Sequence, residues 1–119
     1  MKPKAGTDDA TLVAEGILSA KWNLRIMRVL GDGPARFSGI RAAIPAVSAN
    51  ILAGRLRDLE ECGIIGRRTS PPPADCQVYE LSELGEAARP VMREIDRWAS
   101  LLSRRDVPWS KSQNHLQEE

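Results

Sequence analysis

Two helical patterns separated by a turn of only three residues constrain this chain more than any other feature. The first spans about Ser38 to Ile44 and is stopped by Pro45, which cannot continue a helix. The second begins at Ser48, a favoured N-cap residue, and ends at Gly63, the residue type that most often follows a helix. Two helices joined this tightly are typical of a helix-turn-helix.

Periodicity and helix-breaking residues place the flanking elements. We expect a first helix over about Asp8–Ser19, a second over Lys21–Leu30 that is ended by Gly31–Pro34, and a last one capped by Ser82, kinked near Pro90 and reaching Leu102. Residues 64–69 and 77–81 have strand character, and the Pro-rich residues 70–76 join them as a hairpin. The order predicts a mainly α fold with a small β-hairpin (α+β), the winged helix-turn-helix.

Length and charge limit the organisation and the partner. The 119 residues suffice for one domain, here residues 7–105, between a frayed tail over 1–6 and a flexible tail over 106–119. Residues 21–70 carry nine basic against four acidic side chains, whereas both ends are acidic. A basic middle favours a localised anionic partner such as double-stranded DNA, although Arg-rich surfaces are also common.

Several classes of protein are not supported by the sequence. The start lacks the apolar segment of a signal peptide, and no apolar run is long enough to cross a membrane, so we expect a cytoplasmic protein. His115 and the separated Cys62 and Cys76 form no metal site. Without a phosphate loop, catalytic triad or paired carboxylates, we expect neither an enzyme nor a cofactor.

The outward face of the helix that starts at Ser48 is unusual. Asn50 and Arg57 project from it, and these side chains can pair bidentately with adenine and guanine. Their neighbours are small, which would let the backbone approach a groove: Ala49, Ala53 and Gly54. Acids at the carboxyl end, Glu60 and Glu61, would repel DNA, so the helix should enter amino end first. The alternative is a plain solvated helix.

Other polar residues are candidates for phosphate contacts. Arg67 and Arg68 lie in the first strand of the hairpin, where alternation directs one to each face, so we expect one of them to reach DNA. Ser70 would belong to the tip, and a merely solvated hairpin is the alternative. Ser38 either contacts phosphate or only caps its helix, and Arg55 either contacts phosphate or makes a structural ion pair.

The remaining basic residues and the cysteines have less defined roles. We expect Arg28 to pair with an acid on the last helix, while Lys21 and Arg25 could contact flanking phosphates or pair in the same way. Cys62 falls on the apolar side of its helix and is expected in the core. Cys76, in the loop near arginines, is the candidate reactive thiol, with a purely structural role as the default.

An ordered set of motifs over about residues 12–99 resembles the HxlR-type, MarR-like winged-helix regulators of bacteria. Lys21-Trp22, the Gly-Pro-x-Arg-Phe-Ser turn at 33–38, and Ser48 match the family's helix starts and turn. "LAGRLRDLEECGII" is similar to its Leu-x-x-Arg-Leu-x-x-Leu-x-x-x-Gly-Leu-Val/Ile block, and "VYELSELGEAARPVMREIDRWA" to its Glu-Tyr-x-Leu-Thr-x-x-Gly block and last helix.

The resemblance implies a homodimeric transcription regulator, more often a repressor, that pairs through its first and last helices. The residues expected at that interface are apolar: Leu12, Val91, Ile95, Trp98 and Leu102. Many members carry a Cys-Pro pair before the first helix, and some use its thiol as a sensor; this chain has Asp9-Ala10 there, so that role is not carried over. Cys76 replaces a usual basic residue and Gly54 a usual polar one.

Three functions follow as hypotheses. The first is a repressor that occupies a pseudo-palindromic operator, each half-site read by one subunit. The second is a winged-helix protein-interaction module, whose binding would depend little on salt. The third is a thiol-responsive regulator acting through Cys76. The sequence identifies neither the operator nor any small-molecule or redox effector.

Overall fold

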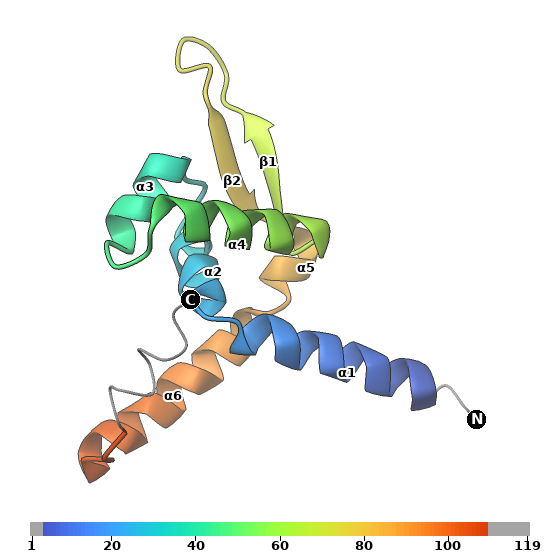
Figure 1. Cartoon of the computed structure of the whole chain (residues 1–119), viewed down its shortest axis with the longest axis vertical. Helices are drawn as coiled ribbons and strands as arrows, with labels where there is room; N and C mark the ends of the chain where they lie inside the picture. Colours follow the sequence, from blue (N-terminus) through green and yellow to red (C-terminus); the bar gives the residue numbers. More distant parts are fainter. Residues whose placement is uncertain (1–3, 110–119) are drawn as a thin grey trace.

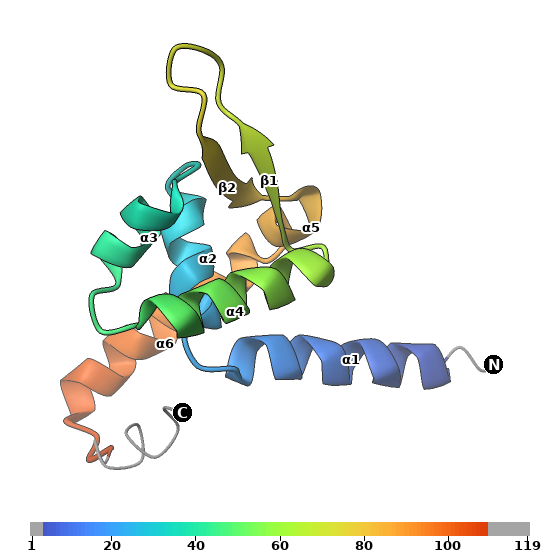
Figure 2. The ribbon, with the colours of Figure 1, turned by 45° about the horizontal axis from the view of Figure 1, so that its top comes forward.

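The computed structural model describes residues 4–109 and has the predicted α+β architecture (Figure 1). Its helices and strands follow in the order α1 (Lys4–Ser19), α2 (Asn23–Gly31), α3 (Phe37–Ala43), α4 (Ala49–Glu61), β1 (Ile65–Thr69), β2 (Gln77–Leu81), α5 (Glu83–Glu86) and α6 (Arg89–Arg105). Helices α2, α3 and α4 and the hairpin form the body, while α1 and α6 project from it in different directions (Figures 1 and 2).

One apolar core holds the body together. Its most deeply buried side chains come from α2, α3, α4 and the turn before α4: Ile26, Met27, Ile40, Val47, Leu52, Leu56 and Leu59. Leu81 at the end of β2 and Met92 of α6 complete the cluster from the hairpin and the last helix. The three leucines of the apolar side of α4, Leu52, Leu56 and Leu59, therefore all pack in the core of the chain itself.

Two helix starts differ from the sequence-based expectation. Helix α1 begins at Lys4, so residues 4–6 are helical and Thr7 is not the N-cap; residues 1–3 lie outside the described part. Helix α2 begins at Asn23, because Trp22 adopts a left-handed backbone with φ of 81°. Trp22 is nevertheless buried, as its apolar periodicity suggested.

The helix-turn-helix itself is confirmed with one correction. Arg36, not Ser38, is the N-cap of α3, so Ser38 is the exposed second residue of the helix and the capping role expected for it is wrong. The turn after α3 is closed by Arg41, whose Nε donates to the Val47 carbonyl at 3.3 Å.

Helix α4 starts and stops as predicted. The Ser48 hydroxyl accepts a hydrogen bond from the Ile51 amide at 3.1 Å, and Gly63 takes the positive φ of 79° that glycine tolerates after a helix. The expected burial of Cys62 is wrong: it is the C-cap residue and its side chain is exposed. The backbone of Cys62 is still right-handed and its amide still bonds the Asp58 carbonyl, but the helix ends here and the side chain remains exposed to solvent.

The predicted hairpin is confirmed. β1 and β2 pair antiparallel, with Ile65 opposite Leu81 and Thr69 opposite Gln77. Ala35, in the turn before α3, forms an additional bridge with Tyr79, including mutual hydrogen bonds of 3.0 and 2.8 Å. The base of the wing is thereby fixed to the helix-turn-helix.

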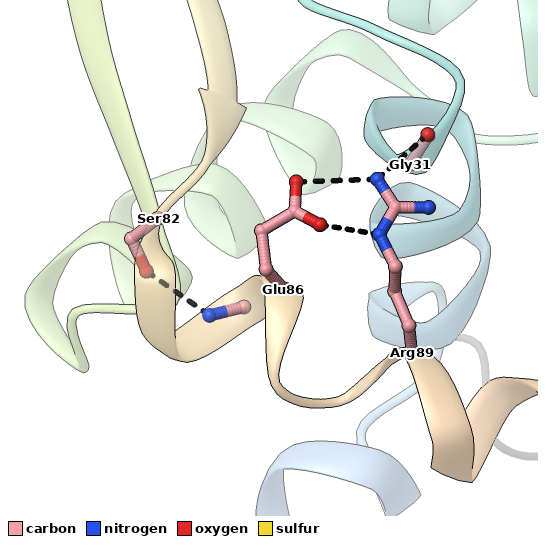
Figure 3. A network of polar contacts seen from close by, with 5 residues as sticks. Gly31, Ser82, Glu86 and Arg89 are labelled. Carbon is pink, nitrogen blue, oxygen red and sulfur yellow. Dashed lines mark hydrogen bonds and ion pairs between the residues drawn. The ribbon is translucent and has the colours of Figure 1, made fainter.

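The last helix is broken where a kink was expected. Ser82 caps the short α5 by accepting from the Gly85 amide, and α6 starts anew with Pro90 in its first turn, where proline needs no hydrogen-bond partner. Helical periodicity over the whole predicted last helix would place Leu84 on its apolar side, but Leu84 lies in the separate α5 and is exposed. Arg89 fixes the corner by donating to the Glu86 carboxylate and to the Gly31 carbonyl (Figure 3).

Helix α6 is joined to the body mainly at its amino-terminal half. Met92 is buried in the core cluster, and Asp96 pairs with Arg28 of α2 at 2.6 Å, which confirms the expected partner of that arginine. The described residues beyond α6, 106–109, form no helix or strand, and residues 110–119, with His115, lie outside the described part.

Candidate DNA-binding surface

From its amino terminus to Arg57, the outward side of α4 presents a low, open face to solvent. Ala49, Asn50 and Arg57 are exposed, and Ala53 is half-buried. At Gly54 an added Cβ would meet no other atom within 4 Å, so the glycine is not required by packing within the chain. The residues predicted to enter a groove thus share one accessible surface, opposite the core leucines of the same helix.

The two wing arginines take different partners. Arg67 donates from Nε to the Glu60 carboxylate of α4 at 3.0 Å and from a terminal nitrogen to Gln77 at 3.3 Å. Arg68 donates to Glu80 of the neighbouring strand at 3.1 Å. The side chains therefore lie on opposite faces of the hairpin, as strand alternation requires.

Glu60 links α4 to the wing. Its hydrogen bond with Arg67, together with the opposite charge, raises the pKa of that guanidinium. Sequence reasoning treated Glu60 only as a group that repels DNA, because helical periodicity carries no information about contacts with a strand seven residues later.

Helix α4 and the wing enclose a shared hollow of about 220 Å³. Ala53, Arg57 and Glu60 line it from the helix, and Arg67 and Tyr79 from the strands. Tyr79 was not among the predicted site residues, although its place opposite Arg67 in the hairpin would have indicated it. The structure thus brings two separately predicted groups, Arg57 on the helix and Arg67 on the wing, to one surface.

Three further candidates lie at the edges of this surface or away from it. Ser38 lines a hollow of about 450 Å³ with other residues of α3 and Pro45, and no residue of α4 lines that hollow. Ser70 closes the wing loop, since its amide donates to the Cys76 carbonyl at 2.7 Å. Arg55 points into the protein, where Nε donates to the Lys21 carbonyl at 2.8 Å, a structural bond to a carbonyl rather than the ion pair considered above.

The cysteines do not form a metal site with their neighbours. Cys76 is half-buried, and its Sγ lies 3.9 Å from the Ser70 hydroxyl. Among the residues that the structure describes, no three His, Cys, Asp or Glu side chains are grouped so that they could hold a metal ion. In the same part of the chain, no helix is both long enough and apolar enough to span a bilayer.

A second surface, on the two projecting helices, is apolar. The exposed fractions are 65% for Leu12 on α1 and 61% for Trp98 on α6. Val91 is also exposed, and Ile95 and Leu102 are half-buried. The two helices project in different directions, so these side chains belong to two exposed apolar faces, and large exposed apolar patches usually mark an interaction site.

A family model agrees with this arrangement. The model of the HxlR-like helix-turn-helix family matches residues 17–106, which include the helix-turn-helix, the wing and α6. The chain belongs to this family. It is a transcriptional regulator of the helix-turn-helix type.

Named relatives place the chain more closely within the family. It is 40% identical over 86 residues to the HTH-type transcriptional regulator YodB of Bacillus subtilis, an alignment that covers 72% of this chain and 77% of the relative. The reduced form of YodB is similar in structure with a TM-score of 0.68, 37% identity and coverage of 83% and 91%. The quinone-bound form of YodB is similar with a TM-score of 0.69 and 35% identity, over 78% of this chain and 98% of that one.

Proposed function

We propose that this regulator binds a pseudo-palindromic operator as a homodimer and represses transcription by occupying it. The observation that carries the proposal is the open face of α4, on which Arg57 shares a hollow with Arg67 of the basic wing. The family membership supports DNA as the partner. In this arrangement α4 enters the major groove and the wing lies along the neighbouring backbone.

Base recognition is assigned to the two long polar side chains of the open face. Asn50 presents one donor and one acceptor to adenine, and Arg57 presents two donors to guanine. The small residues around them let the backbone of α4 approach the bases: Ala49, Ala53 and Gly54. Ser48 is the N-cap of α4, and the free amides and the helix dipole at this end attract a phosphate.

Phosphate contacts are assigned to the wing and to α3. The two wing arginines lie on opposite faces, and we assign the phosphate contact to Arg67, which shares the hollow with Arg57 and would exchange Glu60 for phosphate on binding. Arg68, held by Glu80 on the other face, is not assigned a contact. Ser70 at the end of β1 and Ser38 at the start of α3 would add hydroxyl donors. These contacts position the protein but carry no sequence information by themselves.

The apolar surfaces of α1 and α6 are assigned to the subunit interface. Burying Leu12, Val91 and Trp98 against a second copy would remove exposed apolar side chains of both projecting helices from water. A two-fold dimer presents two recognition helices to half-sites about 34–36 Å apart, one turn of DNA. Bound over a promoter, such a dimer excludes polymerase by its volume.

Fluorescence anisotropy on DNA selected from a random pool tests the assignment. Arg57→Ala is expected to weaken binding by about 1–3 kcal/mol and to relax selectivity at one base position. Arg97→Ala, which removes an arginine exposed on α6, is the matched control and should bind as the parent does. Equal affinity of Arg57→Ala and the parent for the selected site would exclude Arg57 from base recognition.

The salt dependence of binding distinguishes a DNA-binding regulator from a protein-interaction module. Binding should weaken steeply as salt rises, because arginines release counterions from phosphates. Arg67→Ala should weaken binding to all sequences similarly and reduce the salt slope by about one. A slope near zero, with selective association to a protein, would favour the module instead.

A thiol response through Cys76 is a second candidate. The solved quinone-bound form of the relative YodB makes a reactive-thiol regulator a reasonable comparison. In this chain the Cys76 Sγ faces the Ser70 hydroxyl where the wing loop closes, so a bulky adduct would disturb the loop. Quinone treatment should then lower DNA affinity of the parent but not of Cys76→Ser; an equal response of both would remove the thiol from the mechanism.

A further inference from the structure

A side chain of the recognition helix reaches the junction between α1 and α2. Arg55 of α4 donates from Nε to the backbone carbonyl of Lys21 at 2.8 Å, although the two residues are 34 positions apart. Arg55 is half-buried and lies between the core face of α4 and its open face. The bond therefore connects the helix assigned to base recognition with the segment where α1 joins the body.

That junction is held in one conformation by several independent contacts. Trp22, directly after Lys21, has the positive φ of 81° that is uncommon for a residue with a side chain, and its indole is buried. The cations of Lys21 and Arg25 lie over the ring, 5.1 and 5.6 Å from its centre. Strained backbone of this kind persists only where the surrounding structure fixes it.

Asn23, the residue after Trp22, connects the junction to α1. Asn23 is only 4% exposed, and its Nδ2 donates to the Ile17 carbonyl in the last turn of α1 at 2.9 Å. Its Oδ1 is buried without a hydrogen-bond partner among residues 4–109. The junction is thus held by two hydrogen bonds. The side-chain amide of Asn23 donates to the end of α1, and the guanidinium of Arg55 donates from α4 to Lys21.

The direction of α1 is set at this point. Helix α1 packs mainly against α2 and projects from the body as a single rod (Figure 2). Its 16 residues extend about 24 Å, so a small rotation at the junction moves its far end by several ångströms. Because α1 carries part of the proposed subunit interface, such a rotation would also change the distance between the two α4 helices of a dimer.

We infer that Arg55 is a positioning residue that fixes the angle between α1 and α4, and thereby the half-site spacing that the dimer accepts. The inference rests on the proposed function, since spacing has meaning only for a dimer on two half-sites. Arg55 contacts no base in this role. Its guanidinium acts through the Lys21 carbonyl, which a methionine of similar length cannot engage.

The test is a series of operators that differ only in the spacing of the half-sites. Starting from the site selected by the parent, duplexes with one or two base pairs added or removed are compared by anisotropy. Each added pair rotates one half-site by about 34° around the DNA axis, so the parent is expected to bind the two-pair variants at least about tenfold more weakly. Arg55→Met should bind all spacings within about threefold of one another.

Arg41→Met is the matched control, because Arg41 also donates from Nε to a backbone carbonyl but inside the helix-turn-helix. It should keep the spacing profile of the parent even if its affinity falls. Circular dichroism establishes that each variant is folded at the assay temperature. If Arg55→Met is not folded, Arg55→Gln, whose shorter side chain does not span the same distance, is measured against the same expectation.

The outcomes are separable. A spacing profile of the folded Arg55 variant that is as steep as that of the parent overturns the inference while leaving the proposed function intact. Failure of the parent to select any two-part site overturns the proposed function and this inference together. A flattened profile in Arg55→Met with a steep one in Arg41→Met supports it, since a general loss of stability would not change the preference for spacing.

Discussion

Helices α4 and α6 are both amphipathic, but they use their apolar faces differently. In α4, Leu52, Leu56 and Leu59 are buried within the chain, whereas in α6 only Met92 is buried among its residues. Trp98 and Val91 remain exposed. Periodicity therefore indicates that a face will be covered, but not whether the same chain or a second one covers it.

The largest expected effect is on the covered helix. Leu56 is 1% exposed, so Leu56→Ala should lower the free energy of unfolding by about 2–5 kcal/mol, through lost burial and the cavity that remains. Urea denaturation measures it. Leu84→Ala, at an exposed leucine, is the control and should change stability by less than about 0.5 kcal/mol. Equal losses in both variants would contradict the contrast between buried and exposed faces.

The next effect concerns the uncovered helix. Trp98→Ala should leave the helical content unchanged but raise the dissociation constant of the dimer by about thirtyfold or more, as expected for a tryptophan at the centre of an interface. Sedimentation equilibrium measures the change. Trp109→Ala removes another exposed tryptophan, beyond α6, and should leave the assembly intact. A dimer of unaltered affinity in Trp98→Ala would place the subunit interface elsewhere.

Local rules in the sequence were sufficient for most of the fold. The hairpin follows from strand residues that flank a Pro-rich loop, and α4 follows from its serine cap and terminal glycine. The pairing of Arg28 with an acid of the last helix was also predicted. The predicted contacts with DNA and between subunits remain proposals.

Errors arose where one pattern was extended past the end of its element. By helical periodicity Cys62 falls on the apolar side of α4, but the helix ends at Glu61. Leu84 fits the stripe of α6, but the chain breaks between Glu86 and Arg89. The bond from Arg55 to Lys21 could not be predicted, because its acceptor is a backbone carbonyl and leaves no mark in the side-chain pattern.

A smaller effect is expected on the open face of α4. Gly54→Ala should raise the free energy of unfolding by up to about 1 kcal/mol, because alanine is the better helix former and its methyl group meets no other atom within the chain. The same variant should weaken binding to the operator if the backbone of α4 closely approaches DNA. At Gly85 the same substitution should destabilise, since the new Cβ would lie 2.3 Å from the Ile64 carbonyl oxygen.

Binding measurements on Gly54→Ala decide why the glycine is present. A more stable variant with weaker operator binding indicates close approach to the groove. A more stable variant with parental binding would show that the glycine is merely tolerated and that α4 lies further from the bases than proposed.

The smallest expected effect is at the attachment of α6 to the body, where Arg89 bridges Glu86 and the Gly31 carbonyl (Figure 3). The hydrogen bond from Arg89 lowers the pKa of Glu86 from its ordinary value of 4.5. Ionised Glu86 therefore stabilises the fold above that value, and the contribution is lost as pH falls through the lowered pKa of the folded state. Glu86→Gln should accordingly melt below the parent at pH 7, with the difference vanishing in acid.

Thermal unfolding from pH 7 to pH 3 measures this difference, and the exposure of the pair keeps it small. Arg89→Met removes the donor and should abolish the effect of Glu86→Gln when the two changes are combined. If the difference in Tm between parent and Glu86→Gln persists unchanged in acid, the carboxylate charge is not what holds this corner. The attachment of α6 to the body would then depend on the burial of Met92 and on the Arg28–Asp96 pair. The difference between α4 and α6 would in that case lie in how many apolar side chains each helix buries within the chain.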